Sequence, residues 1–190
     1  MKNIILAGLT MGLIMLAMVS SASAVTTILI DQGASWDYKV STSDTWLTGN
    51  AAFGNSYPAG GLEGYIKTDW AADTDLDLKK TFNISGTLNG DATLNVAADN
   101  GVTMYLNDNL IADVNAERYT NYWEYTITVP RSYFTTGSNL LTVLAEDHGG
   151  ATFFDMKLTA DVNPVPVPAA VWLFGSGLVG LAAFRRKKTN

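Results

Sequence analysis

A run of aspartates in the middle of the chain holds the residues best suited to bind a metal ion. Asp73 and Asp75, with Asp69 and Asp77 on either side, place carboxylates at every second or fourth position. Carboxylate oxygens are the ligands that Ca²⁺ prefers in proteins. The run lacks the glycine and the final glutamate of an EF-hand loop, so it predicts either an irregular calcium site or a solvated acidic loop.

Residues suited to catalysis are few. His148 is the only histidine, the chain has no cysteine, and it contains no Gly-x-Ser-x-Gly sequence. These facts disfavour a nucleophilic triad and a transition-metal site. The 18 acidic residues leave room for a glycosidase that uses an Asp/Glu pair, but the sequence singles out no such pair. We therefore predict that the chain is not an enzyme, with a small secreted carbohydrate-active enzyme as the alternative.

The central segment is also rich in tryptophan and tyrosine, whose flat apolar rings can stack on the faces of sugars. Trp70 lies in the turn-like sequence 68–72 and is the ring expected to be exposed, followed by Tyr119 and Tyr122. These three residues are the predicted ligand-binding side chains. The cores of β-sandwiches use the same residue types, so each ring also fits a buried position.

Residues 25–163 show the alternation that is typical of sheets with one buried face. Leu76, Leu78, Phe82 and Ile84 share one parity, and the residues between them are mostly polar. Similar alternation recurs over residues 123–129 and 154–160, and turns rich in Gly, Asn and Asp separate the runs. This period of two, without a convincing amphipathic helix, predicts an all-β fold, an antiparallel β-sandwich of jelly-roll type.

Several short motifs follow one another in an order that resembles the galactose-binding-domain-like jelly rolls appended to carbohydrate-active enzymes. They include the Asp99-Asn100-Gly101 turn, Gly137-Ser138-Asn139, and Asp147-His148-Gly149-Gly150. The resemblance spans residues 36–161 and implies the jelly-roll fold. Related jelly rolls hold a structural calcium through a carboxylate near the last strand. The resemblance therefore adds Asp155 to Asp73 and Asp75 as a predicted metal ligand.

The first 24 residues have the three parts of a secretory signal peptide. Lys2 gives the positive start, residues 4–19 form an almost unbroken apolar run, and Ala22 and Ala24 frame a small-x-small cleavage site. We predict export through the general secretion machinery and cleavage by signal peptidase. An uncleaved membrane anchor is the alternative.

Residues 164–190 have the order of a C-terminal sorting signal. A proline-rich motif that cannot form a helix interior comes first, an apolar segment at 169–184 follows, and a basic tail closes the chain. The apolar segment is short for a full span, but its basic end can hold it in the inner membrane. The motif residues are Val165, Pro166, Val167 and Pro168, and the tail residues are Arg185, Arg186, Lys187 and Lys188.

This order resembles the PEP-CTERM sorting signal, with Val167 in place of the usual glutamate. The resemblance implies processing by an exosortase, a membrane transpeptidase, in a Gram-negative host that makes extracellular polysaccharide. The exosortase would perform the chemistry, and the chain would be its substrate.

The charge of the central segment limits its partners. Five of the 12 basic residues lie in the two terminal segments, so residues 25–163 carry 7 basic residues against 18 acidic ones, a net charge near −11. Such a charge repels phosphate backbones and argues against nucleic acid as a partner.

The sequence thus predicts three parts: a signal peptide at 1–24, a β-sandwich passenger at 25–163 and a sorting signal at 164–190. The chain is expected to pass through the inner membrane and to reach the cell surface or the extracellular matrix. The passenger is expected to be a structural or carbohydrate-binding module. Its expected partners are the exosortase and extracellular polysaccharide, and calcium is the one cofactor considered.

Overall fold

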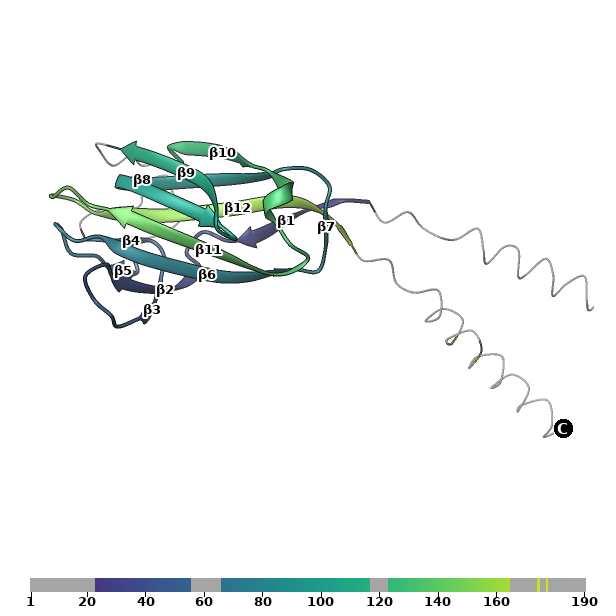
Figure 1. The fold of residues 1–190 in the computed structure, drawn as a ribbon, viewed down its shortest axis with the longest axis horizontal. Helices are drawn as coiled ribbons and strands as arrows, with labels where there is room; N and C mark the ends of the chain where they lie inside the picture. Colours follow the sequence, from purple (N-terminus) through teal and green to yellow (C-terminus); the bar gives the residue numbers. More distant parts are fainter. Residues whose placement is uncertain (1–22, 56–65, 117–122, 165–173, 175–176, 178–190) are drawn as a thin grey trace, which may run out of the picture. The chain divides into compact units, whose positions relative to one another are not determined.

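The computed structural model describes residues 23–55, 66–116, 123–164, 174 and 177 (Figure 1). Contacts along the chain group Ala24–Val165 into one compact unit, and the other unit, Met1–Ser23 with Pro166–Asn190, lies almost entirely outside the described residues. Among the described residues, no helix has the length and the apolar character needed to span a membrane. Apart from Phe174 and Gly177, the predicted membrane segment at 169–184 is outside the described residues.

The compact unit is built from strands, which confirms the predicted all-β sandwich. Turn residues separate successive strands, as the sequence pattern indicates, and one short 3₁₀ helix, η1 (Arg131–Tyr133), follows β10. The strands are β1 (Val25–Ile30), β2 (Ser35–Val40), β3 (Leu47–Asn50), β4 (Phe53–Gly54), β5 (Thr68–Asp69), β6 (Leu76–Ile84), β7 (Gly86–Leu88), β8 (Ala92–Leu106), β9 (Asn109–Ala116), β10 (Tyr125–Val129), β11 (Gly137–Glu146) and β12 (Phe153–Pro164).

These strands form two sheets, which we name sheet A and sheet B. Sheet B has the order β3-β2-β6-β11-β8-β9, and Figure 1 shows β3, β2, β6 and β11 following one another across the unit. In sheet A, β12 lies between β8 on one side and β1 and β4 on the other. β10 pairs with the free side of β8, β7 pairs with the end of β12, and β5 pairs with β4 in parallel.

Strand β8 belongs to both sheets. It is 15 residues long, and up to Asp99 it pairs with β10 and β12 of sheet A. From Asn100 onward it pairs with β9, and from Gly101 also with β11, both in sheet B. The strand therefore passes from one sheet into the other at Asp99–Asn100, and the corner of the sandwich lies there.

The first and last described strands are neighbours in sheet A. Val25 lies opposite Val162, and Thr26 lies opposite Asp161. The Thr26 hydroxyl donates a hydrogen bond to Asp161 Oδ1 at 2.6 Å. The two ends of the compact unit are thus held together by strand pairing.

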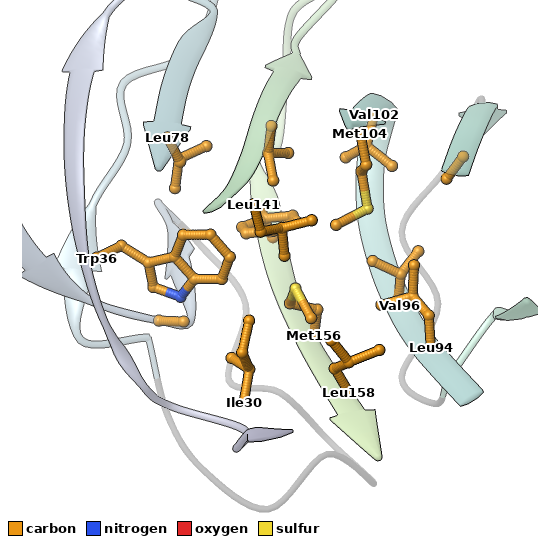
Figure 2. Close-up of a cluster of buried hydrophobic side chains, with 14 of the residues drawn as sticks. Ile30, Trp36, Leu78, Leu94, Val96, Val102, Met104, Leu141, Met156 and Leu158 are labelled. Atoms are coloured by element: carbon orange, nitrogen blue, oxygen red, sulfur yellow. The ribbon is translucent and has the colours of Figure 1, made fainter. Parts of the chain in front are cut away.

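The core fills the space between the two sheets. Figure 2 shows Trp36, Leu78, Leu141 and Met156 pointing toward one another from β2, β6, β11 and β12, and each of them is at most 2% exposed. Burial of these side chains follows the parity of the sequence, because alternate residues of a strand face opposite sides of its sheet. Apolar burial of this kind is the main stabilising contribution in a domain without disulfides.

We predict that the core of the isolated sandwich, residues 25–163, is sensitive to truncation at β8. Leu94 is 0% exposed and lies opposite Leu158, so Leu94→Ala should lower the free energy of unfolding by about 2–5 kcal/mol. Leu110 on β9 is 51% exposed, so the control Leu110→Ala should change it by less than about 0.5 kcal/mol. Denaturant unfolding followed by circular dichroism measures both values. Equal effects of the two substitutions, or no cooperative transition for residues 25–163, would contradict this packing.

Candidate functional site

Buried polar side chains gather at the corner where β8 changes sheets, which we name the loop end. Asp99, Asn100, Asp147 and Thr152 are between 0% and 7% exposed. They come together because Gly101 pairs with the end of β11 and Asp99 pairs with the start of β12, so the β11–β12 loop spans the corner. The His148 N–H donates to Asn100 Oδ1 at 2.7 Å and fixes this loop to β8.

The loop between β5 and β6 is fastened to the β11–β12 loop by carboxylates. The Asp73 N–H donates to Asp147 Oδ2 at 2.5 Å, and the Asp147 N–H donates to Asp75 Oδ1 at 3.0 Å. The Thr152 hydroxyl adds a bond to the Trp70 carbonyl at 2.6 Å. The structure therefore brings Asp73 and Asp75 together with Asp147, an acid that the sequence did not mark as a metal ligand.

Asp155 has a different environment. Its side chain is 2% exposed, and Oδ1 accepts hydrogen bonds from the N–H groups of Gly33, at 3.3 Å, and Met156, at 2.8 Å. Burial raises the pKa of Asp155 to about 6, although these two bonds, the Gln32 side chain and the charge of Lys67 lower it. N–H donors and a lysine around a carboxylate do not suit a cation, so Asp155 does not fit the predicted calcium site.

The predicted metal ligands thus do not form one site. In the part of the chain that the structure describes, no group of three or more His, Asp or Glu side chains is placed to hold a metal. The prediction that Asp73, Asp75 and Asp155 together bind one metal ion was therefore wrong. The Asp155 carboxylate instead accepts backbone N–H groups of the β1–β2 loop and of β12.

The prediction of an exposed Trp70 was also wrong. Trp70 is 1% exposed and belongs to the core. Its indole N–H donates to the Thr74 carbonyl at 2.6 Å, so the short loop after β5 turns back and satisfies the polar edge of the ring internally. Tyr119 and Tyr122, the other two predicted ligand-binding residues, lie outside the described residues.

Trp46, immediately before β3, is an exposed tryptophan that the sequence did not single out. It is 40% exposed, and the ammonium groups of Lys79 and Lys39 lie 3.9 Å and 5.7 Å from its ring centroid. Lys39 is also paired with Asp77 at 2.9 Å. The two lysines contact the ring by cation–π attraction and leave part of the indole accessible. In the sequence, Lys39 and Lys79 alternate with the apolar residues of their strands, so both are expected on the outward side of the sheet. This alternation is the sequence signal that could have indicated the arrangement.

A row of outward-facing side chains crosses sheet B next to Trp46. Strand register places Thr48 opposite Asp37, Asp37 opposite Lys79, Lys79 opposite Thr142, and Thr142 opposite Tyr105. Tyr105 is 41% exposed and lies two strands from Lys79, a distance of about 10 Å at the usual strand spacing. We name this row, together with Trp46, the sheet B face. It combines accessible aromatic rings with groups that donate and accept hydrogen bonds.

The residues predicted for processing are not part of this geometry. Val165, Pro166, Val167 and Pro168 lie outside the described residues, as do Ala22 and the basic tail from Arg185 to Lys188. Ala24 is described, is partly exposed and directly precedes β1.

A comparison with protein families finds the PEP-CTERM protein-sorting motif at residues 164–187. This match confirms the predicted sorting signal. The motif indicates export and exosortase-mediated sorting to the cell surface or the extracellular space. No curated protein matches the chain in sequence.

Among solved structures, the chain is similar to a β-D-mannosidase from Dictyoglomus thermophilum, with 14% identity and a TM-score of 0.46 over 65% of this chain and 16% of the enzyme. It is also similar to a family 35 carbohydrate-binding module from Clostridium thermocellum, with 13% identity and a TM-score of 0.42 over 71% of this chain and 98% of the module. The chain thus spans less than a fifth of the mannosidase. Identities and TM-scores this low say nothing about a shared activity or ligand.

We predict that Asp155 makes stability depend on pH. Its pKa is 3.8 for the free group and about 6 in the folded protein, so the folded state binds the proton more tightly. The contribution of Asp155 to stability should therefore be largest below about pH 3.8 and be lost as pH rises through this window to about 6, by roughly 3 kcal/mol in total.

Asp155→Asn should remove this contribution, because the amide stays neutral at every pH. The exposed control Asp113→Asn should keep the wild-type slope. Urea unfolding at several pH values measures the difference between the variants, and an unchanged slope in Asp155→Asn would contradict the assignment.

Proposed function

We propose that this chain is an exported surface protein whose β-sandwich is a non-catalytic module that binds extracellular polysaccharide or contributes to its matrix. Signal peptidase removes residues 1–24, residues 25–163 form the passenger, and an exosortase processes residues 164–190 during a transient stay in the inner membrane. The observation that carries the proposal is the sorting motif at 164–187 next to a compact sandwich with an accessible aromatic face.

The use of the acidic side chains supports a non-catalytic role over the alternative of a small carbohydrate-active enzyme. A glycosidase needs two carboxyl groups that face a bound sugar across a gap of about 5–9.5 Å. The buried carboxylates of Asp147 and Asp155 instead accept hydrogen bonds from backbone N–H groups, and so does Asp75. These acids hold loops together, which is a structural task.

The sheet B face supports binding to a sugar polymer. Trp46 and Tyr105 offer partly accessible rings for stacking on the apolar faces of sugars. Asp37, Lys79 and Thr142 offer acceptors and donors for hydroxyl groups. Because the passenger carries a net charge near −11, an uncharged polysaccharide fits this face better than a polyanion does.

Processing should depend on the proline motif and on the basic tail. Pro166 and Pro168 keep the motif extended, so that it can enter a protease cleft, and the tail fixes the orientation of the apolar segment. Changing both prolines to Ala, or deleting residues 185–188, should leave an unprocessed precursor in the membrane fraction. Mass spectrometry of the exported protein provides the measurement. Secreted wild-type protein that still contains Trp172 to Phe184 would refute processing at this motif.

Binding to polysaccharide should depend on the sheet B face. Trp46→Ala and Tyr105→Ala should each weaken retention on the extracellular polysaccharide of the host by about fivefold or more, because truncating a contacting aromatic ring costs at least about 1 kcal/mol. Ile28→Ala is the matched control, since Ile28 is 49% exposed but belongs to sheet A.

A glycan array and affinity electrophoresis measure this binding, and a panel of chromogenic glycosides tests for turnover. Equal binding by all variants would remove the sheet B face from the proposal. Turnover that is abolished by one carboxylate substitution would replace the non-catalytic module with the enzyme alternative.

A further inference from the structure

Strand β1 has an open edge. Among the described residues it pairs with β12 alone, so the main-chain N–H and C=O groups along its other side have no strand partner there. Residues 25–28 are all exposed, whereas burial alternates along most of β6 and β11. Val25 is 60% and Ile28 is 49% exposed, and they are the large apolar side chains that sheet A exposes in the described part of the chain. The start of β1 therefore presents apolar side chains together with unused main-chain groups.

This edge lacks the features that usually keep edge strands from joining. Natural proteins protect such strands with charged side chains, proline or bulges. Residues 25–30 include no charge and no proline, and five of the six are β-branched. The bulge of β1 lies at its end, between Ile28 and Ile30, so residues 25–28 keep a regular ladder with β12. By contrast, β9 at one edge of sheet B carries Asp113 in its middle. Strand β1 is thus suited to accept a further strand.

We propose that β1 pairs antiparallel with β1 of a second copy of the chain, so that sheet A continues through both copies. A two-fold axis beside the strand lets the same row of N–H and C=O groups serve both partners, and this is the commonest symmetry of homodimers. The passenger carries a net charge near −11, so two copies repel each other over most of their surface. The uncharged β1 is a place where two such copies can meet with little repulsion.

The two ends of β1 also favour an antiparallel copy. This step rests on the proposed removal of residues 1–24, which leaves Val25 with an α-ammonium group that is charged at neutral pH. Asp31 directly follows the other end of the strand, its side chain is 64% exposed, and the ammonium group of Lys157 lies 4.0 Å from it. In an antiparallel pair, the α-ammonium group of each copy lies toward Asp31 of the other copy. A parallel pair would instead bring like charges together.

Symmetry limits the register to a few choices. Because both copies must present the same faces of the sheet, a two-fold axis perpendicular to the sheet passes beside one residue, which then lies opposite its own counterpart. An axis beside Thr27 uses the whole exposed segment, since it places Thr26 opposite Ile28 and Val25 opposite Leu29 of the other copy. Side chains that favour strands then face each other along the new ladder.

A single introduced cysteine tests the pairing, because the chain has no cysteine of its own. Directly opposite residues of antiparallel strands have Cα atoms about 4.5–5.5 Å apart, which a disulfide can bridge. Exported protein is purified from the host, reduced and then oxidised in air. Thr27→Cys should give a covalent dimer on non-reducing electrophoresis, and Thr26→Cys tests an axis shifted by one residue. Leu110→Cys, at an exposed position of β9, is the matched control and should stay monomeric. No covalent dimer with either β1 cysteine, or an equal yield from the control, would overturn the proposal.

Sedimentation equilibrium measures the same contact without a cross-link, and the wild-type protein alone already tests it. Thr27→Lys places two like charges opposite each other at the axis and should raise the dissociation constant of the dimer by about fivefold or more. Leu110→Lys adds the same charge outside β1 and should keep the wild-type constant. Ile28→Ala leaves the main-chain row intact and should remain dimeric, so it stays a valid control for polysaccharide retention. A wild-type protein that is still monomeric at about 100 μM, or an equal effect of the two lysine substitutions, would refute the β1 dimer.

Two further readouts separate this inference from the proposed function. Mass spectrometry of the purified protein reports whether the signal peptide has been removed, independently of the oligomeric state. Polysaccharide retention of Thr27→Lys reports binding by single copies. A protein that is processed and binds polysaccharide but sediments as a monomer refutes only the pairing of β1, whereas a dimer that binds no polysaccharide refutes only the proposed ligand.

Discussion

The passage of β8 from one sheet to the other is the constraint on which the rest of the sandwich depends. A strand that pairs with both sheets closes one side of the core, but its backbone must turn where the pairing partners change. Backbone polar groups at such a corner have to be satisfied by something other than the regular ladder. Here side-chain oxygens accept the backbone N–H groups of the loops: Asn100 Oδ1 accepts the N–H of His148 in the β11–β12 loop, and Asp147 Oδ2 accepts the N–H of Asp73 in the β5–β6 loop. The polar loop end is thus a result of the topology.

The same topology separates two kinds of surface. At the loop end, Asp147 is buried and Asp75 is partly buried, and the carboxylates of both accept backbone N–H groups. Little of the charge of these two side chains is therefore available to a large ligand. On the sheet B face, register alone sets the neighbours, and the side chains from Thr48 to Tyr105 remain accessible.

Strand parity could be predicted from the sequence because a shift of one residue would move every leucine of β6 into water. The sorting motif could be predicted because its order is local. Strand parity gave the wrong expectation at Asp155. This residue lies between the inward-facing Phe154 and Met156 and should face solvent, yet it is 2% exposed. It is covered by the Gln32–Gly33 segment, a contact across 122 positions that no local pattern encodes. The prediction that Trp70 is exposed failed for a similar reason, because the burial of its ring depends on how the loop after β5 turns back onto the core. The hydrogen bonds of Asp147 to the β5–β6 loop could not be predicted either, because they join residues 72 and 74 positions apart.

The pairing of β1 with β12 has a consequence for the order of events during export. Val25, which directly follows the predicted signal peptide, lies opposite Val162, close to the sorting motif. A chain that crosses the membrane from its N-terminus presents β1 long before its partner emerges. Sheet A therefore cannot close until nearly the whole passenger is outside, and contacts that span so much sequence form slowly. In that interval β1, β4 and the first half of β8 lack the central strand of their sheet. In the proposed route, a C-terminal segment that delays release from the membrane would also give the sandwich time to fold completely before the protein is released.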